Sequence, residues 1–370
     1  MKKKRIIKVT AFLLVFVILF AAVSRMFMTN SNNTRSIQGI YAEKENTLDV
    51  LMVGASSTKT NFASPLAYKN FGFTSYTLSY DGTAFEMLEP LLKEAMKTQS
   101  PKLVLIDLRA VLTPLTNQRA RSVIDNMKWS DNKRETIEKY ASEDSKLSFY
   151  MTLDKYHTRW KDISSVLSYY YYMLTEPLRY DASSQYSLKE IYIDKQHFLK
   201  GFFTSTLIGE TEMCVTFDEV TEKDRISDSA EKAILDMMQY LKEENINGVF
   251  FLSPMCYSER FVYEQRLPQQ LNYARDFVRE HGFECIDLRN NKDAENMGFD
   301  HTTDFGDARH MNINGAVKFT NYFGKMISEK YNLPDHRGDE TYDNEWNKAV
   351  NVMDNVLEYC KKKMKDKFIG

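Results

Sequence analysis

Short apolar runs separated by helix-like patterns occupy most of the chain between residues 45 and 330. The runs are Leu48–Val53, Ser75–Gly82, Leu103–Leu108, Gly248–Pro254 and Phe283–Leu288. Each is too short for a globular helix and has the aliphatic, aromatic or β-branched content of a buried strand. Between runs, apolar residues recur at intervals of three and four, as in Thr83–Lys97. Strands that alternate with helices form parallel sheets, so the pattern predicts an α/β domain with helices on both faces of its sheet.

Two regions break this rhythm and set the predicted domain organisation. Residues 111–226 lack clean alternation and carry scattered Lys and Arg, which indicates an inserted, mostly helical cap that includes a hairpin at Gly201–Ile208. Residues 337–370 are first acidic and then amphipathic, which predicts a helical extension at the C-terminus. The α/β domain itself is therefore expected over residues 45–336.

The N-terminus has the pattern of a membrane segment. Lys2–Arg5 precede a stretch from Ile6 to Met28 that is apolar on all sides, unlike an amphipathic core helix. It is either a signal peptide or an uncleaved anchor, and Arg25–Met28 fits a cleavage site poorly, which favours the anchor. The basic head predicts a single-pass topology with residues 1–28 as anchor, 29–44 as a polar tether and everything beyond outside the cytoplasm.

Composition excludes several function classes. The 370 residues carry a net charge of −2, so no bulk attraction to nucleic acid is expected. The four cysteines show no CxxC spacing, so no metal site is expected from them, and Cys256 and Cys285 are interpreted as buried thiols. The chain shows no phosphate loop and no dinucleotide fingerprint, and we expect no cofactor.

Two motifs carry candidate chemistry. The first apolar run ends in Gly54-Ala-Ser-Ser57, where a following helix would leave backbone N–H groups exposed beside a serine hydroxyl. Far downstream, Asp307 and His310 are three residues apart, close enough for a turn to aim the carboxylate at one ring nitrogen. The other nitrogen is then available to a hydroxyl, which is the arrangement of a serine–histidine–aspartate triad.

At these motifs the chain resembles the SGNH/GDSL hydrolase superfamily, whose sheet is flavodoxin-like. Gly54-Ala-Ser56 resembles its first block and Asp307-x-x-His310 its last, and the resemblance covers about residues 45–110 and 245–330. It implies Ser56 as nucleophile, His310 as base and Asp307 as its orienting carboxylate. The backbone N–H groups of Ser56 and Gly82 would form the oxyanion hole. The family's Gly-x-Asn-Asp is absent after the third strand, where Ile106-Asp-Leu-Arg109 stands instead, so a third oxyanion donor is not assigned.

The serine block without its aspartate is closest to the envelope branch of that superfamily, which holds DltD and the alginate O-acetylation proteins. This resemblance implies an esterase or O-acyltransferase that acts on a cell-envelope polysaccharide or teichoic-acid-like polymer. It also implies a membrane-bound O-acyltransferase as partner. The alternative is a non-catalytic envelope protein that binds a glycan or acts as a scaffold on the same fold.

Four further residues are candidates for the cleft. Arg109 follows the third strand, and His157-Thr-Arg-Trp160 resembles a segment of envelope SGNH proteins, although a histidine there also fits a purely structural role. Ser57 neighbours the proposed nucleophile and is expected to bond a free backbone N–H in the first turn of the helix.

Overall fold

The computed structural model describes residues 2–27, 32–151, 156–164, 166–167, 199–209, 220–255 and 262–369. Its centre is a five-stranded, all-parallel sheet with strand order β2-β1-β3-β4-β5, the flavodoxin-like order. The strands are β1 (Val50–Gly54), β2 (Ser75–Ser79), β3 (Leu103–Asp107), β4 (Gly248–Leu252) and β5 (Cys285–Asp287). Each lies inside one of the five apolar runs, and the predicted α/β class is confirmed.

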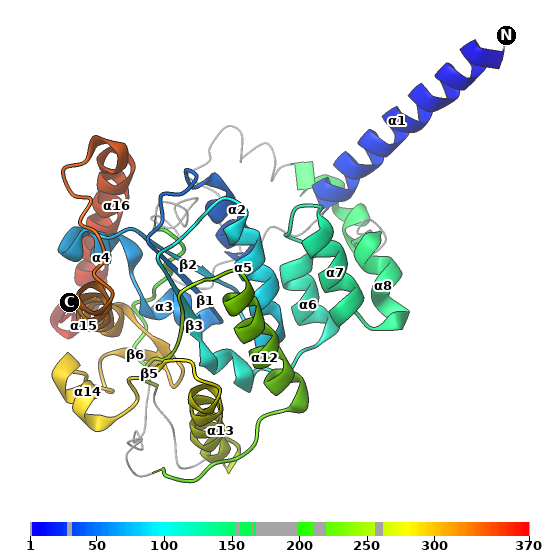
Figure 1. Cartoon of the computed structure of the whole chain (residues 1–370). Helices are drawn as coiled ribbons and strands as arrows, with labels where there is room; N and C mark the ends of the chain where they lie inside the picture. Colours follow the sequence, from blue (N-terminus) through cyan, green and yellow to red (C-terminus); the bar gives the residue numbers. More distant parts are fainter. Residues whose placement is uncertain are drawn as a thin grey trace.

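Helices cover both faces of the sheet, which is why β1, β3 and β4 are almost entirely apolar, whereas the edge strand β2 alternates polar and apolar residues. Leu51 and Val53 face one core with the short helix η1 (Phe85–Met87), α5 (Leu88–Met96), α12 (Asp228–Glu243) and α13 (Val262–Glu280). Val50 and Met52 face the other, with α4 (Ser64–Phe71), α14 (Asn291–Met297) and α15 (Ile313–Lys330). Figure 1 shows these two helix layers on opposite sides of the sheet.

The C-terminal segment forms α16 (Glu340–Met364), followed by the turn η5 (Lys365–Lys367). Its Trp346 is buried and stacks on Tyr68 of α4, with 4.9 Å between the ring centroids. Cys360 of α16 and Cys285 of β5 are buried thiols. The other two cysteines, Cys214 and Cys256, lie outside the described residues.

The N-terminal helix α1 (Lys2–Phe27) projects from the body (Figure 1). Its span Lys3–Ser24 is long and apolar enough to cross a membrane, and its most apolar stretch is not buried against the body of the protein. Length and composition are equally those of a signal sequence.

The predicted tether over residues 29–44 is wrong where the structure describes it. Residues 32–42 form helix α2 (Asn32–Ala42), with Ile37 and Ile40 buried one turn apart against the core. The hydroxyl of Tyr76 on β2 donates to the carbonyl of Ser36 at 2.7 Å. These two apolar residues give the polar segment a buried face, and tertiary packing makes it a helix.

The region beyond β3 begins with the turn η2 (Leu108–Leu112) and continues as α6 (Asn117–Ile124), α7 (Asp131–Tyr140) and α8 (Glu143–Tyr150), then η3 (His157–Asp162). The predicted hairpin at 201–208 is wrong, because residues 201–209 contain no strand. The Phe203 N–H donates to the carbonyl of Lys59, and the Gly209 N–H donates to that of Phe305. Apart from a turn in which the Phe202 N–H donates to the Leu199 carbonyl, these backbone hydrogen bonds go to distant elements.

Candidate active site

The first site element is the turn between β1 and the short helix α3 (Ser56–Asn61). A side chain at Gly54 would place its Cβ 1.9 Å from Thr58 Oγ1 and 2.7 Å from the Cβ of Asp107. Glycine is therefore required for α3 to approach the end of β3 this closely. Ser56 is the first residue of α3, where backbone N–H groups have no acceptor within the helix.

The second element is a small antiparallel hairpin formed by β6 (Phe305–Asp307) and β7 (His310–Met311). The turn brings Asp307 opposite His310 and turns the carboxylate back onto the chain. Asp307 Oδ1 accepts hydrogen bonds from the N–H groups of Arg309 and His310, at 2.8 and 2.9 Å. The carboxylate is thereby fixed before it contacts the imidazole.

The two elements meet at the carboxyl edge of the sheet. Ser56 Oγ lies 2.7 Å from His310 Nε2, although the residues are 254 positions apart. His310 Nδ1 lies 2.9 Å from both carboxylate oxygens of Asp307. Burial raises the pKa of Asp307, but hydrogen bonding and charge interaction with His310 outweigh it, so the pKa lies below its usual value. An ionised Asp307 favours the tautomer with its proton on Nδ1, which leaves Nε2 to accept from Ser56.

Beneath the site, three buried side chains fix the backbone on both sides of His310. Arg109 Nη2 donates to the carbonyl of Arg309 at 2.5 Å, and Asn61 Oδ1 accepts from the N–H of Met311 at 3.3 Å. Both side chains also donate to Ser253 Oγ, at 3.1 and 2.9 Å. This Ser253 hub joins η2, the first residue after β4 and helix α3 to the hairpin that carries the histidine.

Asp107, buried at the end of β3, holds helix α3, which carries Ser56. Its Oδ2 accepts from the hydroxyls of Ser57 and Thr58 at 2.8 and 2.9 Å, and its Oδ1 accepts from the N–H of Arg109. The segment Ile106–Arg109, which replaces the expected third block, thus holds both the serine helix and the histidine loop. The predicted cap role of Ser57 is wrong, since its hydroxyl donates to a carboxylate and Ala55 is the N-cap.

A cavity of about 290 Å³ opens beside Ser56 and His310. Its lining residues are Ser56, Lys59, Thr60, Asp81, Phe203, Ser205, Leu207, Gly306, Asp307, His310 and Met311. Lys59 Nζ pairs with Asp81 Oδ1 at 2.8 Å and lies 5.4 Å from the centroid of the Phe203 ring. This ion pair joins the serine helix to the turn after β2, where Gly82 has the left-handed φ of +63° that a glycine adopts freely.

The four predicted cleft residues do not line this cavity. Ser57 and Arg109 are buried behind it, at 3% and 6% exposure. His157 and Trp160 are exposed on η3, with their ring centroids 6.4 Å apart in an edge-to-face arrangement. Gly82 follows the lining residue Asp81 directly but does not itself line the cavity.

Several residues that line the cavity were not predicted from the sequence. Two of them could have been found, and three could not. Lys59 and Thr60 lie three and four positions after Ser56, so the helical period alone places them on the same face of α3 as Ser56. Phe203, Ser205 and Leu207 belong to a segment without periodicity that is positioned by hydrogen bonds to α3 and β6, and no local signal reveals it.

Comparisons with known proteins leave the family of the chain open. No protein-family model matches it, and no curated protein matches it. Among solved structures, a Bacteroides fragilis protein assigned as an acylhydrolase aligns at 12% identity and a TM-score of 0.38, covering 82% of this chain and 100% of its own. A family two carbohydrate esterase from Clostridium thermocellum, in complex with cellohexaose, aligns at 7% identity and a TM-score of 0.33, covering 79% and 67%.

Proposed function

We propose that this protein is an acyl-transfer enzyme of the SGNH type, with Ser56 as nucleophile, His310 as general base and Asp307 as the orienting carboxylate. The observation that carries the proposal is the continuous hydrogen-bonded chain from Ser56 Oγ through both ring nitrogens of His310 to Asp307, open to a cavity. A serine hydroxyl is a weak nucleophile and needs a base at this distance.

The geometry supports a two-step reaction. Ser56 Oγ attacks the acyl carbonyl of an ester while its proton passes to His310 Nε2, and the resulting imidazolium is stabilised by the Asp307 carboxylate. Collapse of the tetrahedral intermediate breaks the bond to the leaving alcohol, which takes the proton from Nε2. Water or an acceptor hydroxyl then attacks the acyl-serine by the same route, giving an esterase or an O-acyltransferase respectively.

The negative charge of the intermediate requires donors that are already oriented. The N–H of Ser56, at the start of α3, is the first proposed donor, and the N–H of Gly82 is the second. The Lys59–Asp81 ion pair supports the second assignment, because it holds the turn that contains Gly82 against the serine helix. Arg109 supplies no donor here, since its guanidinium contacts Ser253 and the Arg309 carbonyl.

For the substrate we propose a cell-envelope polysaccharide or teichoic-acid-like polymer, with a membrane-bound O-acyltransferase as partner. The apolar helix α1 supports an extracytoplasmic, membrane-anchored site for this chemistry. The competing function is a scaffold that binds a glycan without turning it over.

A fluorophosphonate probe separates the two functions. The full chain in neutral detergent should be labelled at Ser56 and should hydrolyse a small acyl ester, because the probe reacts only with an activated serine. A wild-type protein that takes no probe and turns over no ester, even beside its membrane partner, would favour the scaffold.

Replacement of Arg109 by Lys is expected to lower kcat about tenfold to a hundredfold with KM little changed. The ammonium group loses the fork that reaches Ser253 and the Arg309 carbonyl together, and a displacement of His310 by about 1 Å is enough for such a loss. Ester kinetics measure the effect, with Arg134→Lys on the exposed face of α7 as the matched control. An Arg109→Lys enzyme with the kcat of the wild type would show that the Ser253 hub does not position the histidine.

The topology is testable in cells. Protease added to intact cells whose wall has been removed should digest the domain after α1, because Lys2–Arg5 are expected to hold the N-terminus in the cytoplasm. A cytoplasmic marker protein should survive the same treatment. Complete protection of the domain would contradict the proposed location and the proposed polymer substrate.

A further inference from the structure

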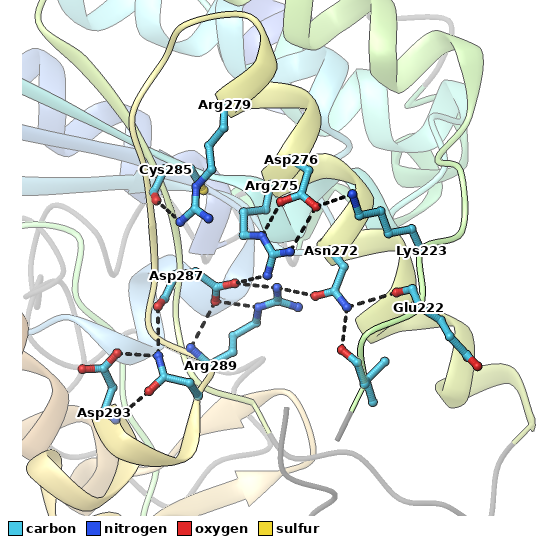
Figure 2. Close-up of polar contacts among 12 residues, drawn as sticks. Glu222, Lys223, Asn272, Arg275, Asp276, Arg279, Cys285, Asp287, Arg289 and Asp293 are labelled. Atoms are coloured by element: carbon cyan, nitrogen blue, oxygen red, sulfur yellow. Dashed lines mark hydrogen bonds and ion pairs between the residues drawn. The ribbon is translucent and has the colours of Figure 1, made fainter. Parts of the chain in front are cut away.

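A second hollow, of about 260 Å³, lies at the carboxyl end of β5, far along the sheet from Ser56. Its lining comes from Val220, from Asn272, Arg275 and Arg279 of α13, and from the end of β5 and the two residues that follow Leu288, namely Asp287, Arg289 and Asn290. Three arginines and one carboxylate therefore share this lining (Figure 2). The proposed acyl-transfer chemistry uses none of these residues.

The arginines are held in place by the protein. Arg289 is buried, with 1% of its side chain exposed, and it donates through Nε and Nη2 to both oxygens of Asp287 at 2.8 and 2.7 Å. Its Nη2 also donates to Asn272 Oδ1 at 2.9 Å. Arg275 Nη1 approaches the same Asp287 carboxylate at 3.2 Å from the other side. Figure 2 shows both guanidinium groups converging on Asp287.

The carboxylates that border this cluster have partners of their own, among them Asp293, which accepts from Asn290 and from Tyr322, each at 2.6 Å. Asp276 forms ion pairs with Arg275 and with Lys223. The charges of Asp276 and Lys223 cancel, so these two residues add no net charge. The carboxylate of Glu222 accepts instead from Gln269. Burial raises the pKa of Asp287, but the hydrogen bonds and charges of Arg289 and Arg275 outweigh it and keep this carboxyl ionised. Counted over the lining residues alone, three guanidinium groups and one carboxylate leave an excess of two positive charges.

Arg279 has the free donor capacity that a ligand needs. Within the described residues, its guanidinium makes one hydrogen bond, from Nη2 to the carbonyl of Cys285 at 2.8 Å. A guanidinium carries five N–H donors in a planar fork that matches carboxylate and phosphate oxygens.

We propose that Arg275, Arg279 and Arg289 form a binding site for an anionic group, a phosphate or a carboxylate, carried by an acidic polymer or present as a free anion. The site lies on the same edge of the sheet as Ser56. Three strand spacings separate β1 from β5, roughly 14 Å at about 4.8 Å each. If the proposed function holds, this spacing lets the site bind an acidic group of the polymer whose acyl ester lies at Ser56.

The test is thermal unfolding of the full chain in neutral detergent with inorganic phosphate, with D-glucuronate, and with sodium chloride at the same ionic strength. A bound anion raises the midpoint by mass action, and chloride sets the baseline. Phosphate or glucuronate should raise the unfolding midpoint above its value in chloride. The anion that does so shows whether the site binds a phosphate or a carboxylate. Failure of both to exceed chloride would overturn the proposal.

Two variants of α13 test whether the rise in the unfolding midpoint comes from the arginine site. Arg279→Gln should weaken phosphate or glucuronate binding about tenfold, the loss expected for one charge-assisted hydrogen bond. Arg266→Gln, on the same helix and paired with Asp224, removes the same charge and should bind as the wild type does. Equal binding by both variants would overturn the assignment. Ser56→Ala should keep the full anion response, so failure of the proposed chemistry is distinguishable from failure of this site.

Discussion

Replacement of Ser56 by Ala is expected to abolish labelling by a fluorophosphonate probe and to lower turnover of a small acyl ester by about 10⁴-fold or more. The reason is that the hydroxyl 2.7 Å from His310 Nε2 is the only atom that we assign to the covalent step. The free energy of unfolding should change by less than about 1 kcal/mol, because the half-buried hydroxyl makes a single neutral hydrogen bond. Probe labelling, ester kinetics and urea unfolding together measure these three quantities.

Ser57→Ala is the matched control, one residue away on the same helix. This variant should keep its labelling, because the Ser57 hydroxyl is buried and donates to Asp107 rather than facing the cavity. It should lose about 1–3 kcal/mol of unfolding free energy, since the buried carboxylate loses one of its donors. If the probe labelled the Ser56→Ala protein but not the Ser57→Ala protein, Ser57 would be the nucleophile.

The sheet was predictable because its physics is local. A strand buried on both faces is mostly apolar, and that leaves a continuous run such as Leu103–Ile106 in the sequence. The order of the strands does not follow from these local patterns, and the flavodoxin-like order was expected only from the SGNH resemblance. By contrast, helix α2 has a polar composition and becomes helical because Ile37 and Ile40 pack on the core. No local pattern reveals a contact made by two residues.

The candidate site divides in the same way. Ser56, Asp307 and His310 were found because a strand end and a three-residue spacing are local features. The Ser253 hub was not found, since it consists of hydrogen bonds between Arg109, Asn61 and a loop some 200 residues away. The role of Asp107 was missed for the same reason: its partners are about 50 positions earlier.

Asp307, the acidic partner of His310, leads to a prediction about the catalytic rate. Asp307→Asn should lower kcat by about 10³- to 10⁴-fold, because an amide cannot stabilise the imidazolium and leaves the wrong tautomer facing Ser56. Combining it with His310→Ala should add little to His310→Ala alone, since members of one triad act as a unit. Additive losses in kcat would show that the two residues act separately.

The same variant should alter the acid stability of the fold. The pKa of Asp307 is lower in the folded protein than its ordinary value of 3.8, so the ionised carboxylate stabilises the fold above that pH. This stabilisation is lost as the pH falls below 3.8 and through the lower pKa of the folded state. Urea unfolding from pH 6 to pH 2.5 should therefore show a shallower loss of stability in Asp307→Asn than in the wild type. Identical pH dependence in the two proteins would mean that His310 does not hold this carboxylate ionised, and the proposed role of Asp307 would fail with it.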